Sequence, residues 1–242
     1  GGDALYAIVN NAGCGLNQAG DVSGDNVCNT NMYGPKRVCE AFIPLLQPSG
    51  ARIVNVGSGA GPGFVNKNPQ HRDLLCRWST TWEQLEALAQ TTPWDADAPV
   101  SYYGFSKAGL HVFSRVLSQT HPAITTSTVS PGFILTAMTK GWGAKKPPEE
   151  GTVSILHCLF DELTGSGFFY GSDAKRSPLH YMRDPGTPST SATRTTTRDA
   201  SEHTCIIRMF TSVTCGRVAM TGHEYSRRPG STCTMYSTCR YK

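Results

Sequence analysis

Short apolar runs and turn-forming residues alternate along this chain and predict strands. Residues 5–9 are apolar and lead into an Asn-Asn-Ala-Gly turn, and residues 53–56 lead into a glycine-rich segment. Both runs are typical of buried strands that enter a turn. Two more strands are predicted at 125–129, which stops before Pro131-Gly132, and at 167–171.

Helical periodicity separates these strands. From Lys36 the apolar positions follow the i, i+3, i+4, i+7 spacing of one helix face; they are Val38, Ala41, Phe42, Leu45 and Leu46. Further helices are predicted at 101–119 and after Pro148, and one at 81–90 within an otherwise irregular stretch, 62–100. The alternation of strand and helix predicts an α/β fold with a parallel sheet.

Composition narrows the class of protein. The 242 residues are 38% hydrophobic and 17% charged, which excludes a chain that is disordered throughout and a coiled coil. No run approaches the roughly 18 apolar residues that a membrane span needs. The first residues have no basic stretch before the apolar run, so they do not resemble a signal peptide.

The last quarter of the chain differs from the rest. Residues 187–242 contain seven Ser and thirteen Thr without an apolar period, and eight Lys or Arg against three Asp or Glu. Residues 1–186 contain fourteen basic and fifteen acidic residues, so the net charge of +4 comes from this tail. We expect one folded domain over 1–186, no nucleic-acid partner, and a disordered, dispensable tail. A basic, phosphorylatable tail that recruits an acidic partner is the alternative.

The nine cysteines show no pairing pattern. None forms C-x-x-C, and no His lies at zinc-ligand spacing from a cysteine pair, so we expect no metal site. Reduced thiols in a cytosolic protein are the expectation.

Tyr103 and Lys107 carry the clearest chemical signal. On a helix, positions i and i+4 lie on one face, so the ammonium group is near the phenol. A nearby cation lowers the pKa of a tyrosine toward the range in which it works as a general acid for carbonyl reduction. By itself the spacing is common, and a surface pair is the alternative.

Ser58 follows a buried strand directly. Ligands of open parallel sheets bind at the carboxyl ends of strands, although a simple turn serine among glycines has the same sequence. A hydrolase G-x-S-x-G turn is excluded, because Val56 and Ala60 occupy the glycine positions.

Asn31 lies four residues before Pro35. If the helix at Lys36 extends back this far, Pro35 cannot donate to the Asn31 carbonyl, which is then free for a water or a ligand. Alternatively, Pro35 simply occupies the first turn of the helix.

Together these segments resemble the short-chain dehydrogenase/reductase family. The resemblance covers about residues 1–180. Residues 10–13 are similar to its N-N-A-G signature, Tyr103 and Lys107 to its Y-x-x-x-K pair, and residues 131–136 to its P-G-x-x-x-T segment. The catalytic residues that the resemblance implies are Asn31, Ser58, Tyr103 and Lys107. The cofactor-binding residues that it implies are Asn10, Ala12, Gly13, Tyr103, Lys107, Pro131, Gly132 and Thr136.

The resemblance implies a Rossmann-like, doubly wound parallel sheet and a hydride-transfer mechanism. Ser58 would hydrogen-bond the substrate carbonyl and Tyr103 would supply the proton. Lys107 would bind the nicotinamide ribose and lower the pKa of Tyr103, and the main chain of Asn31 would hold a water that leads toward Lys107.

Residues 62–100 resemble an insertion of the monomeric carbonyl reductases, where an added helix covers the surface through which other members pair. The segment lies between Ser58 and Tyr103. The resemblance therefore implies a monomeric, cytoplasmic, NADPH-dependent enzyme that reduces small ketones, aldehydes or quinones, with NADP preferred over NAD on the resemblance alone.

The chain departs from the family at its start. It begins at the family's fourth strand, and the 242 residues contain no T-G-x-x-x-G-x-G turn and no counterpart of strands 1–3. We therefore expect a chain truncated at its N-terminus that binds NADPH weakly by itself, because diphosphate affinity comes from the glycine-rich turn. The alternative is a catalytically inactive fragment or an interaction remnant.

Overall fold

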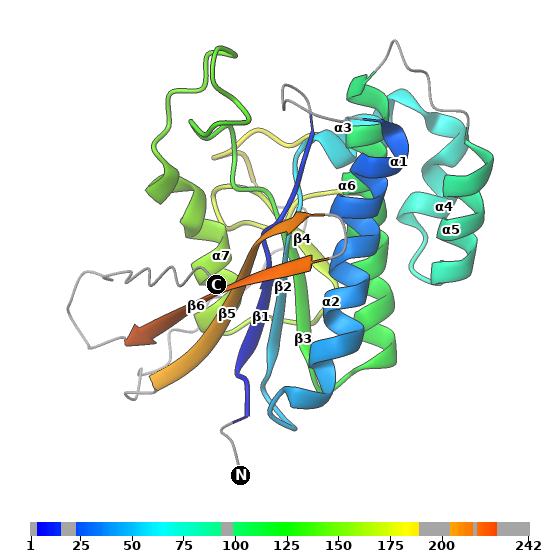
Figure 1. The fold of residues 1–242 in the computed structure, drawn as a ribbon. Helices are drawn as coiled ribbons and strands as arrows, with labels where there is room; N and C mark the ends of the chain where they lie inside the picture. The colour runs from blue at the N-terminus through cyan, green and yellow to red at the C-terminus, as the bar shows by residue number, and fades with distance from the viewer. Residues whose placement is uncertain (1–3, 16–22, 93–98, 189–203, 215–216, 227–242) are drawn as a thin grey trace.

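A six-stranded sheet forms the middle layer of the computed structural model, which describes residues 4–15, 23–92, 99–188, 204–214 and 217–226 (Figure 1). The strands are β1 (Ala7–Asn10), β2 (Arg52–Val56), β3 (Thr125–Val129), β4 (Phe168–Tyr170), β5 (Thr204–Thr214) and β6 (Arg217–Ser226). Their order is β4-β3-β2-β1-β5-β6. Neighbouring strands are parallel from β4 to β5, and β6 runs antiparallel to β5.

Helices cover both faces of this sheet. Figure 1 shows α2 and α6 on one face and α7 on the other. The α-helices are α1 (Gly24–Cys28), α2 (Gly34–Phe42), α3 (Ala60–Lys67), α4 (Arg72–Cys76), α5 (Trp82–Thr91), α6 (Pro99–Thr120) and α7 (Val153–Phe160). A π-helix, η1 (Asn29–Tyr33), joins α1 to α2, and short 3-10 helices are η2 (Ile43–Leu45), η3 (Pro69–His71) and η4 (Pro148–Thr152).

The central strands are buried on both faces, as is usual for parallel sheets covered by helices. In β1, Ile8 packs in the cluster with α2 and α6, while Ala7 and Val9 pack in the cluster with α7. This arrangement confirms the predicted α/β, Rossmann-like fold. The four strands predicted from the sequence are present within one or two residues of their expected bounds.

The prediction that 62–100 is mostly irregular is wrong for its first part. Helices α3 and α4 lie there in addition to the predicted α5. Pro62 lies in the first turn of α3, where a missing N–H is tolerated. Phe64, Val65 and Leu75 are buried in the core cluster that includes α6, so tertiary packing holds helices that the glycines of this segment disfavour.

The helix before Lys36 extends back further than its apolar period predicts. It includes α1 and η1, with Pro35 in the first turn of α2. The segment immediately before the proline is a π-helix, and at its end the Gly34 N–H donates to the Asn29 carbonyl five residues earlier. The other end is shorter than predicted, because Leu45 lies in η2 and is exposed.

Residues 187–242 were predicted to be a disordered tail. The structure instead has two strands in this region, β5 and β6. β5 pairs in parallel with β1 from Ala7 to Asn10, on the edge that β2 leaves open. A strand added there satisfies the backbone N–H and C=O groups of β1, and this bonding needs no apolar period in the added segment. The rest of the predicted tail, apart from residues 187 and 188, lies outside the described residues.

Across the described ranges, none of the helices is both long enough and apolar enough to cross a membrane.

Candidate active site

The carboxyl ends of β1 to β4 meet at one edge of the sheet. Loops 11–15, 57–59, 130–147 and 171–187 leave the strands at this edge. Ligands of open α/β sheets bind at this edge, so we expect a binding site here.

Helix α6 brings Tyr103 and Lys107 to this edge. The Lys107 Nζ lies 5.7 Å from the centroid of the Tyr103 ring. Lys107 is buried, and its ammonium group donates a hydrogen bond of 2.9 Å to the Val56 carbonyl at the end of β2. Burial lowers the pKa of Lys107 to about 8, since desolvation disfavours the charged form.

Ser58 completes this cluster from the loop after β2. Its side chain hydrogen-bonds Tyr103, and its Oγ accepts from the Ala60 N–H at 3.1 Å. Two hydroxyls and an ammonium therefore converge from two elements far apart in the sequence.

The sequence predicts a lowered pKa for Tyr103, but the structure gives a raised one. Burial raises the pKa of Tyr103 above its ordinary value, and the hydrogen bond from Ser58 opposes this shift only in part. The physical reason is that the phenolate loses its hydration, while the Lys107 ammonium is engaged by the Val56 carbonyl. A raised pKa keeps the phenol protonated, which suits a proton donor.

Asn31 is fully buried in η1 and connects the loop after β1 to α6. Its Oδ1 accepts from the Cys14 N–H at 2.9 Å, and its Nδ2 donates to the Cys14 carbonyl at 2.8 Å and to the Ser106 Oγ at 3.1 Å. The side chain thus fixes loop 11–15 against the helix that carries Tyr103 and Lys107.

Gly13 lies where this loop passes the cluster. A Cβ at Gly13 would lie 3.3 Å from the Asn31 Oδ1 and 3.5 Å from the Lys107 Nζ. Asn31, Lys107 and Gly13 are therefore neighbours in space. The sequence motifs assigned all three to one site but gave no contact between them.

Gly15 also lies in this cluster, and it was not among the residues predicted from the sequence. A Cβ there would lie 2.6 Å from the Tyr103 Cδ2 and 2.8 Å from its Cε2, so a side chain at this position displaces the ring. The Gly-Cys-Gly run after the Asn-Asn-Ala motif was the available signal.

Asn10 points into the interior rather than into this cluster. Its Nδ2 donates to the Asn55 Oδ1 at 2.7 Å and to the Cys39 Sγ at 3.4 Å, and Asn55 in turn donates to the Ser114 Oγ at 2.8 Å. Its side chain therefore links β1 to β2. Ala12 lies half-buried in the loop above it.

Pro131, Gly132 and Thr136 lie on the loop after β3, at the same edge. Gly132 has a φ of +90°, and a Cβ there would lie 3.0 Å from the Ser172 Cβ on the loop after β4. Thr136 is exposed, and its N–H donates to the Thr139 Oγ1 at 2.9 Å. Among the described residues no group of three or more His, Cys, Asp or Glu side chains has the arrangement of a metal site.

Comparison with known proteins gives relatives for this arrangement. No protein-family model matches the chain. The chain is 30% identical over 195 residues to carbonyl reductase [NADPH] 1 of Mus musculus, covering 72% of this chain and 70% of that protein. It is 33% identical over 161 residues to (+)-neomenthol dehydrogenase of Arabidopsis thaliana, covering 58% of this chain and 52% of that protein.

Solved structures of reductases share the fold of this chain. Salutaridine reductase from Papaver somniferum aligns with a TM-score of 0.56 and 26% identity, over 69% of this chain and 72% of that one. The chain spans about half the length of several curated relatives that it matches. The shared fold, the similarity over most of a relative's length and the cluster at the sheet edge lead to one conclusion. This chain belongs to the short-chain dehydrogenase/reductase family.

Proposed function

We propose that this chain forms the catalytic part of an NADPH-dependent oxidoreductase that reduces the carbonyl groups of small molecules. The convergence of Ser58, Tyr103 and Lys107 at the carboxyl edge of the sheet carries the proposal. The relatives named carbonyl reductase [NADPH] 1 and salutaridine reductase support the reaction type. Ketones, aldehydes and quinones are the proposed substrates.

The donor set fits the nicotinamide ribose of such a cofactor. Lys107 has three N–H donors, and Tyr103 and Ser58 each have a hydroxyl. Gly13 and Gly15 place no side chain of the adjoining loop against Lys107 or the Tyr103 ring. These residues would hold the ribose and the carboxamide end together with residues 131–136. NADPH, when bound, supplies the hydride.

Ser58 and Tyr103 act on the substrate oxygen in this proposal. The Ser58 hydroxyl donates a hydrogen bond to the carbonyl oxygen and orients it. Tyr103 transfers its proton to the same oxygen as the carbonyl carbon is reduced, and its raised pKa keeps that proton in place at neutral pH.

Lys107 and Asn31 support this step. Lys107 binds ribose hydroxyls and stabilises negative charge on the Tyr103 oxygen after the proton has left. Asn31 holds the loop that carries Gly13 against α6. Asn31 is therefore a positioning residue in our proposal, since its side chain acts through Cys14 and Ser106.

We propose further that the protein is a monomer in the cytoplasm. The segment around α4 and α5 covers α6, where Trp82 packs edge-on against Phe113 at 5.5 Å and buried Leu85 lies against Gly109. The described cysteines are free thiols, which suits a reducing compartment. Trp78, by contrast, is 46% exposed, so less of its side chain is buried in this segment than of Trp82.

The Tyr103→Phe variant tests the proposed reaction. In protein expressed from the complete coding sequence, we expect kcat for an aldehyde or quinone to fall by about 10²–10⁴-fold, because the proton donor is lost. The dissociation constant for NADPH, measured by fluorescence titration, should stay within about threefold, since Lys107 makes the ribose contacts.

Tyr102→Phe is the matched control, since it removes a neighbouring hydroxyl on the same helix. Near-normal turnover of Tyr103→Phe would remove Tyr103 from its proposed role. A protein that reduces no carbonyl compound in this assay would favour the inactive-remnant alternative.

A further inference from the structure

The segment after β4, residues 171–187, is held by a buried ion pair. Asp173 and Arg183 form a two-pronged interaction in which the Arg183 Nη1 lies 3.0 Å from the Asp173 Oδ2 and Nη2 bonds Oδ1. The arginine side chain is 3% exposed and the aspartate 17%. Planar pairs of this kind fix geometry as well as adding energy.

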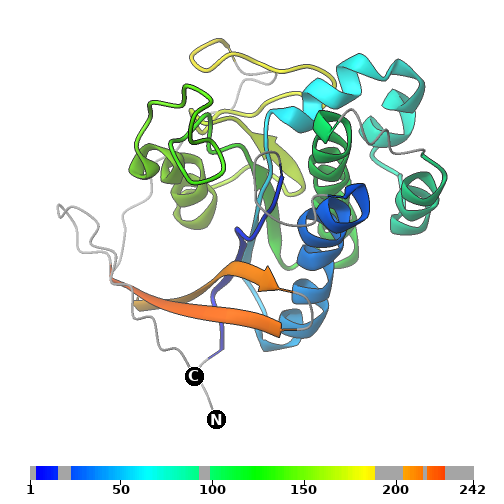
Figure 2. The ribbon, with the colours of Figure 1, turned by 45° about the horizontal axis from the view of Figure 1, so that its top comes forward.

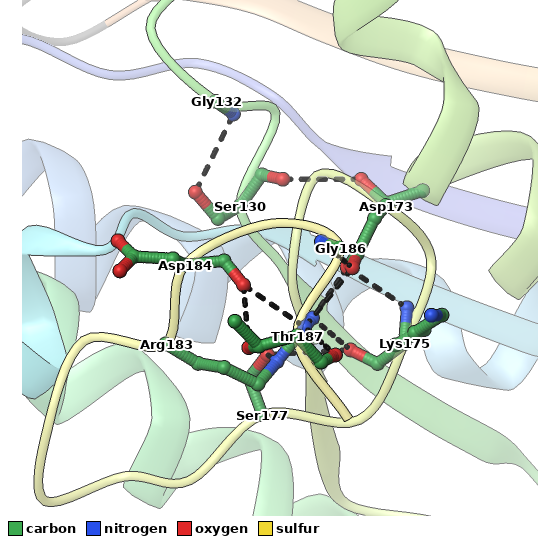
Figure 3. Close-up of polar contacts among 10 residues, drawn as sticks. Ser130, Gly132, Asp173, Lys175, Ser177, Arg183, Asp184, Gly186 and Thr187 are labelled. Atoms are coloured by element: carbon green, nitrogen blue, oxygen red, sulfur yellow. Dashed lines mark hydrogen bonds and ion pairs between the residues drawn. The ribbon is translucent and has the colours of Figure 1, made fainter. Parts of the chain in front are cut away.

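Further hydrogen bonds radiate from this pair (Figure 3). Asp173 also accepts from the backbone N–H of Gly186 at 2.8 Å, and Arg183 donates to the Ser177 Oγ and the Thr187 carbonyl, each at 2.9 Å. These donors lower the pKa of Asp173 to about 2, so the pair stays charged at any pH at which the protein would be assayed. The segment is therefore closed on itself from Asp173 to Thr187.

The closed segment lies across the proposed active-site edge. Figure 2 shows it, in yellow, at the same end of the sheet as the loop after β3, in green. The Ser177 N–H donates to the Phe169 carbonyl at 2.8 Å, which anchors it to β4, and Ser172 lies against Gly132.

Met182 is the side chain that this segment places against Gly59, the residue after Ser58. A Cβ at Gly59 would lie 3.0 Å from the Met182 Sδ and 3.2 Å from its Cγ, so the thioether rests on the backbone next to the proposed carbonyl-orienting serine. Met182 is 62% exposed, and its neighbour Tyr181 is 40% exposed. An exposed methionine that lies against Gly59 and directly precedes the buried Arg183 in the sequence offers an apolar and adaptable contact surface.

We infer that Met182 is a specificity-determining residue that packs against the larger apolar substituent of the carbonyl substrate, and that the Asp173–Arg183 pair positions it. The inference rests on the proposed function and narrows it to uncharged ketones or aldehydes with a bulky alkyl or aromatic group. A carbonyl oxygen on Ser58 has Gly59 beside it. Apart from the chain neighbours of Gly59, the atoms of the described residues within 4 Å of a Cβ built at that glycine all belong to Met182.

Steady-state kinetics with a matched pair of ketones tests the inference. Protein from the complete coding sequence is assayed with NADPH and either cyclohexanone or 4-tert-butylcyclohexanone. For Met182→Ala we expect kcat/KM to fall about tenfold for the bulky ketone and to change less than twofold for the small one. Leu45→Ala, an exposed apolar residue at the other end of the sheet, is the control and should change neither.

Asp173→Ala tests the positioning role. We expect it to raise KM for the bulky ketone about tenfold while kcat for both ketones and KM for cyclohexanone stay within twofold. An unchanged kcat for cyclohexanone shows that the variant is folded. If Asp173→Ala does not fold, the Met182 kinetics alone decide the inference.

A binding measurement separates this inference from the proposed reaction. Methionine methyl groups are labelled with ¹³C, the Met182 signal is assigned by its loss in Met182→Leu, and 4-tert-butylcyclohexanone is titrated in the presence of NADP⁺. A saturable shift of that signal is expected. An active enzyme whose Met182 signal does not move, or whose preference Met182→Ala leaves unchanged, would overturn the inference. A shift without any turnover would contradict the proposed reaction and support the binding surface.

Discussion

Single residues around Tyr103 and along α6 determine the packing and the charge of the proposed site. Gly15 gives the Tyr103 ring its space, and Lys107 and His111 lie one and two helical turns beyond the tyrosine, both buried. His111 packs against Phe169 with ring centroids 4.3 Å apart. A substitution of one of these residues changes the volume of its side chain or the protonation state of its ionisable group.

Gly15→Ala should displace Tyr103. Its new methyl group would overlap the ring, and overpacking of this kind costs about 1–3 kcal/mol. We expect a lower free energy of unfolding by that amount and, in the catalytically active protein, a loss of about tenfold or more in kcat/KM. Gly63→Ala is the control, because a Cβ there has no atom within 4 Å. Equal effects of the two variants would mean that Gly15 is no site residue.

His111 should make the fold sensitive to acid. Burial, with the charges of Arg115 and Lys107, lowers the pKa of His111 from 6.5 to about 3. Between these values the unfolded chain binds a proton that the folded chain does not, so stability is lost as the pH falls from 6.5 toward 3. One such group contributes a slope of at most about 1.4 kcal/mol per pH unit.

Urea unfolding of the wild type and of His111→Gln at several pH values from 7 to 4.5 measures this slope. We expect the variant to lose stability less steeply by up to that amount per pH unit. Parallel curves for the two proteins would show that His111 does not cause the acid sensitivity.

At the scale of elements, Arg115 links the segment around α4 and α5 to α6. Its guanidinium is buried and donates to three backbone carbonyls at the end of α4: Cys76 at 2.5 Å, Arg77 at 2.8 Å, and Leu75. Carbonyls at a helix C-terminus lack partners within the helix and carry partial negative charge, so a cation suits them. No carboxylate is needed for this contact.

Arg115→Met should loosen this segment, since the carbonyls become unsatisfied and each such group costs about 1–3 kcal/mol. We expect faster proteolysis between residues 60 and 92 and, because α6 becomes uncovered, association in sedimentation equilibrium. Arg77→Met removes an exposed arginine that pairs with Asp73 and should do neither. A monomeric, protease-resistant Arg115→Met would contradict both the link and the proposed role of the segment.

At the scale of the whole molecule, the strands from the last quarter of the chain close one side of the sheet. β5 lies beside β1, and β6 follows it as the outer strand. The folded segment 171–187 ends with hydrogen bonds to Thr187, so a chain that stops after Pro188 keeps that segment intact. Such a chain isolates the contribution of β5 and β6.

Deletion of residues 189–242 should therefore promote association. The backbone groups of β1 that β5 satisfies become an open edge, and such edges pair with other chains. Size-exclusion chromatography and sedimentation would show dimers or aggregates. A stable monomer with unchanged unfolding behaviour would support the sequence-based prediction of a dispensable tail instead.

The sequence by itself determined the features that depend on neighbours along the chain. Tyr103 and Lys107 share a helix face because the helical repeat places i and i+4 together, whatever lies around them. The strands at 7–10 and 52–56 followed from their apolar runs and turns, and Pro35 marked an irregular helix start. From these local patterns the α/β fold and most of the proposed site residues could be predicted.

Only the tertiary structure decided which distant segments meet and what their protonation becomes. Asn31 on Cys14, Gly15 under Tyr103, Arg115 on the end of α4 and Met182 over Gly59 are contacts between segments with no shared local period. The raised pKa of Tyr103 has the same origin, because burial outweighed the lysine that the spacing brought near it. Packing and desolvation depend on the whole folded chain, whereas helical or strand periodicity and turn formation depend on short stretches of sequence.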